Sequence, residues 1–124
     1  MRDFTDDLKD LRRRLGEAET YLKIGFARSR LAELEMEVSR PDLWDDQELA
    51  KKVNAEYANV KSDLDTFDSL SGELEDAELL HEMAREVDDE SQEADIQSAV
   101  EGISAQLRLL DLRSLFTEIG RAHV

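Results

Sequence analysis

The residue pair that comes closest to a chemical motif is Glu78-x-x-His81, an acid and an imidazole about one helical turn apart. In di-iron helical bundles such a pair supplies two metal ligands from one helix, and the complete site needs two such pairs and two further glutamates. The other histidine, His123, stands at the far end of the sequence. We therefore predict no metal site, and we expect His81 to lie on the surface of a helix.

No other spacing of residues indicates catalysis. The sequence has no cysteine, no glycine-rich phosphate-binding loop and no Gly-x-Ser-x-Gly nucleophile motif. Carboxylates are plentiful, but a catalytic carboxylate needs a pocket that shifts its pKa, and a solvated acidic face provides none. We therefore predict no catalytic, cofactor-binding or metal-binding residues, no small-molecule ligand and no enzymatic activity.

The charge of the chain limits its partners. The 124 residues include 16 basic and 31 acidic side chains, for a net charge of -15. Residues 63–95 alone contain 14 acidic residues, opposed only by Arg85. Such a surface repels phosphate backbones, so we expect contacts through a protein partner or through the more balanced first 60 residues. The cluster Arg12-Arg13-Arg14 fans around about 200° of a helix, which fits either a solvated face or a contact with an acidic partner.

Three aromatic side chains can be either structural or part of a binding surface. Trp44 is either structural, packed on Leu49 as a hydrophobic staple, or an anchor for a binding partner. Tyr21 and Phe26 carry the same two alternatives. Met36 and Met83 are expected to fill the core.

Apolar spacing predicts the helices that hold these residues. The first stripe runs through Phe4, Leu8, Leu11, Leu15, Ala18 and Leu22, and a second runs through Ile24, Ala27, Leu31, Leu34 and Val38. The phase slips between them, so we expect a kink, stutter or short break between Tyr21 and Phe26, near Gly25.

Pro41 ends the second stripe, and the next helix is expected to start with Asp45 as its N-cap and Glu48 in a capping box. Its stripe comprises Leu49, Val53, Tyr57, Val60, Leu64, Phe67, Leu70 and Leu74, continues to Val87, and has a possible bend at Gly72. Polar residues 88–92 predict a turn before a last helix with Ile96, Val100, Ile103, Leu107 and Leu110.

These elements can bury their stripes only against one another. The sequence therefore predicts an all-α fold, an elongated, coiled-coil-like antiparallel bundle of three to four long helices. No apolar run approaches the roughly 18 residues of a membrane span, and no signal peptide is visible, so we expect a cytoplasmic protein that does not contact membranes.

Several segments, in order along the chain, resemble the N-terminal domain of bacterial peptide chain release factor 2, a class I release factor. The most specific are Pro41-Asp42-Leu43-Trp44-Asp45-Asp46 and the ending Leu112-Arg113-Ser114-Leu115-Phe116-Thr117. Weaker similarity is found at residues 30–35, 50–53, 73–80, 88–90 and 107–111. The similarity covers residues 3–117, and the tryptophan loop favours this factor over release factor 1.

The resemblance implies a role in translation termination. Release factors of this family read the stop codons UGA and UAA with a Ser-Pro-Phe tripeptide and promote peptidyl-tRNA hydrolysis with a Gly-Gly-Gln loop. Neither tripeptide occurs in these 124 residues. The family's N-terminal domain projects toward the large-subunit stalk base, near the GTPase-associated centre. The implied partners are thus the ribosome, through the full-length factor, and the remaining domains of that factor.

The similarity stops after Thr117. We therefore expect a domain at residues 1–117 and, at residues 118–124, a cloning scar or a disordered tail. An alternative function remains open on the residues alone, namely a general coiled-coil oligomerisation or adaptor module whose apolar seams pair between chains.

Overall fold

Residues 1–122 fold into four α-helices joined by short connections. The computed structural model describes the backbone of residues 1–122 and the side chains of residues 1–116. The elements in order are α1 (Thr5–Tyr21), α2 (Ile24–Val38), the 3-10 helix η1 (Leu43–Asp45), α3 (Gln47–Glu86), the 3-10 helix η2 (Glu90–Gln92) and α4 (Glu93–Ala122). No strand occurs among these residues. The predicted all-α bundle of long antiparallel helices is confirmed.

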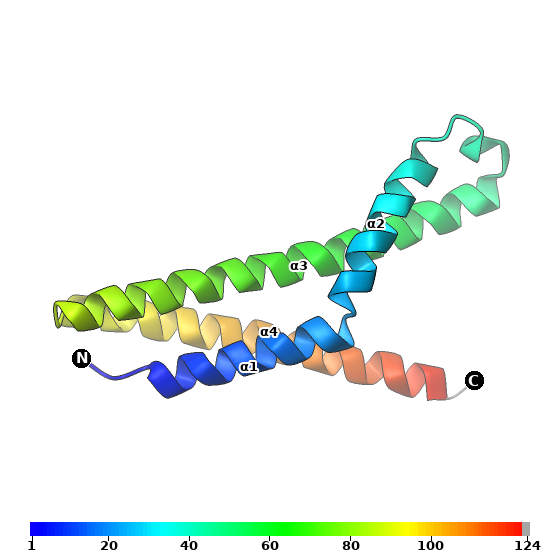
Figure 1. Cartoon of the computed structure of the whole chain (residues 1–124). Helices are drawn as coiled ribbons and strands as arrows, with labels where there is room; N and C mark the ends of the chain where they lie inside the picture. The colour runs from blue at the N-terminus through cyan, green and yellow to red at the C-terminus, as the bar shows by residue number, and fades with distance from the viewer. Residues whose placement is uncertain (123–124) are drawn as a thin grey trace.

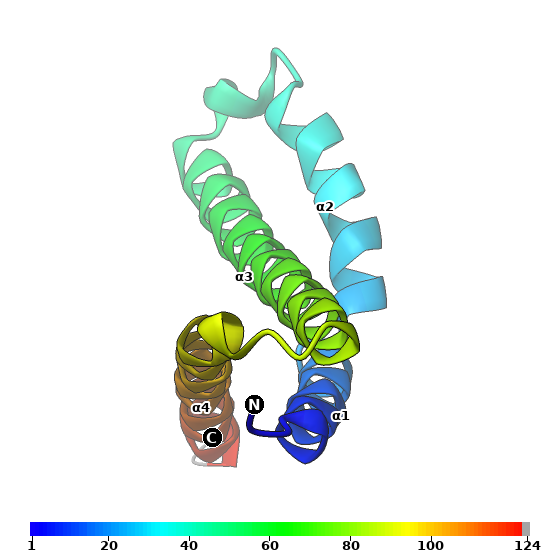
Figure 2. The same cartoon turned by 90° about the vertical axis from the view of Figure 1, so that its left-hand side faces the viewer.

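The long helix α3 organises the molecule (Figure 1). Its C-terminal half lies beside α1 and α4, and these three helices form a triangle when viewed nearly end-on (Figure 2). Its N-terminal half leaves this bundle and pairs with α2, which swings away from α1. The molecule is therefore a three-helix bundle extended by a two-helix hairpin, with the loop between α2 and α3 at the outer tip.

Each part has its own apolar core. The larger core contains most of the predicted stripes, including Leu8, Leu15, Leu70, Ile103 and Leu107. The smaller core lies in the hairpin and consists of Leu34, Leu43, Ala50 and Val53, with the half-buried Val60 packing against both cores. Burial of such stripes, rather than helix propensity alone, supplies most of the stability of these helices.

The break predicted between the first two stripes is confirmed, but its position differs from Gly25. Helix α1 ends at Tyr21, and Lys23 adopts a left-handed conformation with φ of 52° before α2 begins at Ile24. Gly25 lies in the first turn of α2 and has no positive φ. The chain therefore turns at a lysine, in a conformation that costs L-residues about 1–2 kcal/mol.

The start of α3 corrects two predictions. The N-cap is Asp46, whose carboxylate accepts the backbone N–H of Leu49 over 3.1 Å, and not Asp45. Glu48 is consequently one position too early for the predicted capping box. The staple is also wrong, because Trp44 and Leu49 are 65% and 49% exposed, whereas Leu43 is buried. The predicted bend at Gly72 does not interrupt α3, which is helical over all 40 residues.

Two further expectations concern the surface and the end of the chain. Met36 and Met83 are exposed, at 74% and 56%, so the prediction that they fill the core is wrong. Helix α4 passes the predicted boundary at Thr117 and runs to Ala122. Residues 123–124 lie outside the described residues, as do the side chains from 117 onward, and the separate tail at 118–124 stays a prediction. None of the described helices is both long and apolar enough to cross a membrane.

Candidate interaction surfaces

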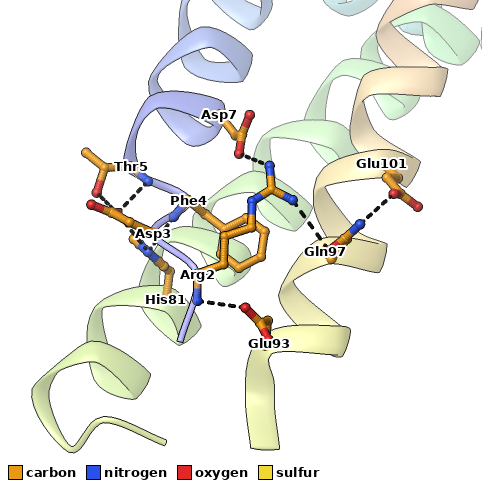
Figure 3. A network of polar contacts seen from close by, with 9 residues as sticks. All are labelled: Arg2, Asp3, Phe4, Thr5, Asp7, His81, Glu93, Gln97 and Glu101. Atoms are coloured by element: carbon orange, nitrogen blue, oxygen red, sulfur yellow. Dashed lines mark hydrogen bonds and ion pairs between the residues drawn. The ribbon is translucent and has the colours of Figure 1, made fainter. Parts of the chain in front are cut away.

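The histidine of the Glu78-x-x-His81 pair is buried, which corrects the expectation of a surface residue. His81 is 5% exposed, and its Nε2 accepts the backbone N–H of Phe4 over 3.1 Å (Figure 3). The two rings pack edge to face with centroids 5.8 Å apart. The signal for this burial was present in the sequence, because Leu74, Ala77, His81 and Ala84 follow one another at steps of three and four residues.

The first residues of the chain surround this contact with a polar network (Figure 3). The Asp3 carboxylate accepts the hydroxyl and the backbone N–H of Thr5, and these hydrogen bonds lower the pKa of Asp3, with Arg85 adding a smaller effect. Arg2 stacks over the Phe4 ring and donates to Asp7, while its backbone N–H donates to Glu93 at the start of α4.

This network ties the first residues of the chain to α3 and α4. His81 is already engaged by a backbone donor, and Glu78 pairs with Arg12. In the part of the chain that the structure describes, no three acidic or imidazole side chains are placed to hold a metal ion.

The three consecutive arginines of α1 point in different directions and each meets an acidic or polar group of the same chain. Arg12 pairs with Glu78 on α3, and Arg13 stays on α1 between Asp10 and Glu17. Arg14 donates to Ser104 on α4 over 2.9 Å. The cluster therefore braces α1 and does not form a single cationic patch.

The tip of the hairpin is the clearest candidate for a contact surface. We define the hairpin tip as residues 36–49, which lie at the end of the molecule farthest from the N-terminus (Figure 1). It exposes three large apolar side chains, Met36, Trp44 and Leu49. Exposed aromatic residues on a supported loop are typical anchors of protein interfaces. The exposure of Trp44 favours a role as a binding anchor over a structural role as a staple on Leu49.

Contacts next to the hairpin tip keep the Trp44 side chain on the surface. Leu43 inserts into the small core, and its backbone N–H bonds to the carbonyl of Arg40 over 3.2 Å. Farther down, Arg30 of α2 donates to both carboxylate oxygens of Glu56 on α3, at 2.6 and 2.7 Å, which lowers the pKa of Glu56. These contacts fix the loop relative to both helices.

The last turns of α4 form a second exposed apolar surface. Leu109, Leu112, Leu115 and Phe116 are 46–72% exposed. Tyr21, at the end of α1, reaches α4 at Asp111 and donates its hydroxyl over 2.8 Å. Of the two other aromatic candidates, Tyr21 is thus half-buried between α1 and α4, whereas Phe26 is exposed at 71%.

Comparisons with known proteins agree with this architecture. Residues 27–121 match the PCRF domain. Peptide chain release factor 2 of Saccharopolyspora erythraea is 34% identical over 115 residues, which are 93% of this chain and 31% of that protein. Peptide chain release factor 2 of Burkholderia pseudomallei is 32% identical over 110 residues, 89% of this chain and 30% of that protein.

The chain spans about a third of the length of these relatives. The similarity to release factor 2 noted in the tryptophan loop and in the ending of the sequence is thereby confirmed. Because the matched region covers well over half of its residues, the chain belongs to the PCRF domain family.

Proposed function

We propose that this chain is the non-catalytic domain of a translation termination factor, and that it positions the factor at the stalk base of the large ribosomal subunit. The relatives named peptide chain release factor 2 support the role in translation termination. The tripeptides Ser-Pro-Phe and Gly-Gly-Gln do not occur in these 124 residues. We therefore assign the reading of UGA or UAA and the promotion of hydrolysis to other parts of the full-length factor.

The exposed Trp44 at the hairpin tip is the observation that supports a positioning role. An exposed indole on a braced loop provides a large, rigid contact area at low cost in conformational entropy. The hairpin tip holds five acidic residues and one basic residue, Arg40, and the charged residues of the segment 63–95 are all acidic except Arg85. An acidic tip repels the phosphate backbone of RNA, so we expect its contact to be with a protein of the ribosome.

Cosedimentation of the 124-residue chain with ribosomes tests this proposal. Trp44→Ala is expected to weaken binding at least tenfold, as truncation of an interface anchor does. Leu79→Ser, which removes another exposed apolar side chain from α3, is the matched control and should bind as the unmodified chain does. Equal binding by the two variants would refute the hairpin tip as the contact.

The location on the ribosome needs a second measurement. Because the chain has no cysteine, Gln47→Cys introduces a single attachment point for a photoactivated cross-linker at the exposed hairpin tip and keeps Trp44 in place. Cross-links are expected in the protein components of the large-subunit stalk base. Cross-links confined to the small subunit would overturn the placement even if the tip binds ribosomes.

The exposed apolar end of α4 favours a second candidate, an oligomerisation or adaptor module. Leu112, Leu115 and Phe116 could pair between chains as a short coiled-coil seam. Light scattering across a range of concentrations separates the two functions. A mass that stays that of a monomer would exclude self-association through this seam.

A further inference from the structure

A groove runs between α3 and α4 on the side that α1 does not occupy. It has a volume of about 350 Å³. Its lining includes Glu73, Asp76 and Leu80 on α3 and Ser98, Gly102 and Gln106 on α4. Glu78 and Ser104 face the opposite way, because they bind Arg12 and Arg14 of α1. Figure 2 shows α1 on one side of the α3–α4 pair and no helix on the other.

The shape of the groove suits a helix. Its wall on α4 is low because Ser98 and Gly102, four residues apart, have small side chains or none. A Cβ added at Gly102 would meet no atom within 4 Å. Packed helices have axes 8–10 Å apart, and the distance depends on the side chains at the contact. A further helix in this groove would complete a four-helix arrangement around α3 and α4.

Apolar side chains extend the groove beyond its lining residues. On α3, Leu80 is followed at steps of three and four by Met83 and Val87, which are 56% and 74% exposed. On α4, Leu109 follows Gly102 at a step of seven and is 67% exposed. A helix that lies along α3 from Val87 to Glu73, a span of 15 residues, would cover about 21 Å.

The charge of the groove indicates which kind of partner it can bind. Glu73 and Asp76 line it, no basic residue does, and the amide of Gln106 is the group that donates to Glu73. Neither carboxylate forms an ion pair with the described residues. A second copy of this chain, with its net charge of -15, would bring acid against acid. Nucleic acids and anionic membranes would be repelled for the same reason.

We infer that the α3–α4 groove binds an amphipathic helix of a protein partner, with an apolar face on Leu80 and Gly102 and with lysine or arginine beside Glu73 and Asp76. This binding mode is the helix-in-groove recognition of an apolar helical stripe. Basic residues on both sides of that stripe would neutralise the carboxylates and set the orientation. The site is separate from the hairpin tip, so it does not depend on the proposed ribosome contact.

A synthetic helix of leucine and lysine, patterned with one apolar face, is the probe. NMR titration of the ¹⁵N-labelled chain should shift the amides of Leu80, Ala99 and Gly102 most strongly. Gly102→Leu fills the groove and is expected to weaken binding at least tenfold. Gly16→Leu, at an exposed position of α1 that is equally open, is the matched control and should leave binding unchanged.

Charge provides the second arm of the experiment. The same peptide with glutamate in place of lysine should not bind, and Glu73→Gln combined with Asp76→Asn should weaken the lysine peptide several-fold. Circular dichroism verifies that every variant remains helical. Shifts spread evenly over residues 63–95, with equal binding by Gly102→Leu and Gly16→Leu, would show only non-specific attraction and would overturn the inference.

Discussion

The backbone N–H of Phe4 donates a hydrogen bond to Nε2 of His81 over 3.1 Å, joining two buried residues 77 positions apart in the sequence. An acceptor Nε2 requires a neutral imidazole that carries its proton on Nδ1. His81 is the only buried polar residue among the described side chains. The contact therefore anchors the segment before α1 to α3.

Loss of this acceptor should destabilise the domain. His81→Ala leaves the buried N–H of Phe4 without a partner, which costs about 1–3 kcal/mol, and removes the ring contact as well. Urea denaturation should show a lower midpoint. His81→Gln, whose side-chain carbonyl is an acceptor, should lose less stability than His81→Ala. Equal midpoints for the unmodified chain and His81→Ala would contradict a structural role for the hydrogen bond.

The hydrogen bond of Tyr21 to Asp111 should make stability fall at alkaline pH. Burial, followed by the Asp111 carboxylate, raises the pKa of Tyr21 above its ordinary value of 10.0. Above about pH 10 the unfolded chain then releases this proton more readily than the folded chain, so unfolding becomes more favourable as pH rises. Tyr21→Phe should be less stable at pH 7 by about 1 kcal/mol.

The stability of Tyr21→Phe should depend less on alkaline pH than the stability of the unmodified chain does. Between about pH 9 and about pH 11, the unfolding midpoints of Tyr21→Phe are expected to fall less than those of the unmodified chain. Tyr57→Phe is the matched control, because it keeps Tyr21 and should keep the full decrease. Parallel curves for all three proteins would disprove the contribution of Tyr21.

Opposite substitutions, to glycine at one position and from glycine at another, are both expected to stabilise the α1–α2 junction. Lys23 has a φ of 52°, which glycine adopts without strain, so Lys23→Gly should stabilise the domain by up to about 1 kcal/mol. Gly25 is helical with open space around it, so Gly25→Ala should stabilise by about 0.5–1 kcal/mol. Lys23→Val should destabilise. Thermal unfolding of the three variants measures these signs, and a stabilising Lys23→Val would be inconsistent with the left-handed turn.

The helices could be predicted because their apolar spacing is a local property of the sequence. The stripe from Phe4 to Ala18 is buried throughout, and the phase slip before Ile24 located the break to within a few residues. The choice between Lys23 and Gly25 as the turning residue depends on the packing of α1 and α2 against α3. Spacing alone carries no information on that packing.

The candidate surfaces were less predictable, because exposure depends on which helix covers which groove. Met83 continues the α3 stripe, yet it is exposed because α1 lies on the other side of α3. His81 is buried because the first residues of the chain cover it, a contact between segments far apart in sequence. Trp44 is exposed because η1 turns Leu43, rather than Trp44, into the small core.

Hydrogen exchange should divide α3 into two halves, although it is one continuous helix. Its N-terminal half is held by a core of four buried residues, Leu34, Leu43, Ala50 and Val53, whereas its C-terminal half belongs to the larger core. Segments that bury less apolar surface open at lower free energy than the whole domain. Amides at residues 50–57 should therefore exchange faster than those at residues 67–81.

The variant Leu43→Ala tests whether the hairpin opens as a unit. It removes a buried side chain from the small core and should cost about 2–4 kcal/mol of local stability. Exchange should accelerate in α2 and in the first turns of α3, while the amides around Leu70 and Leu107 keep their protection. Uniform acceleration along all of α3 would mean that hairpin and bundle unfold together. A hairpin that opens separately would instead leave the tip free to adjust to a partner while the bundle stays folded.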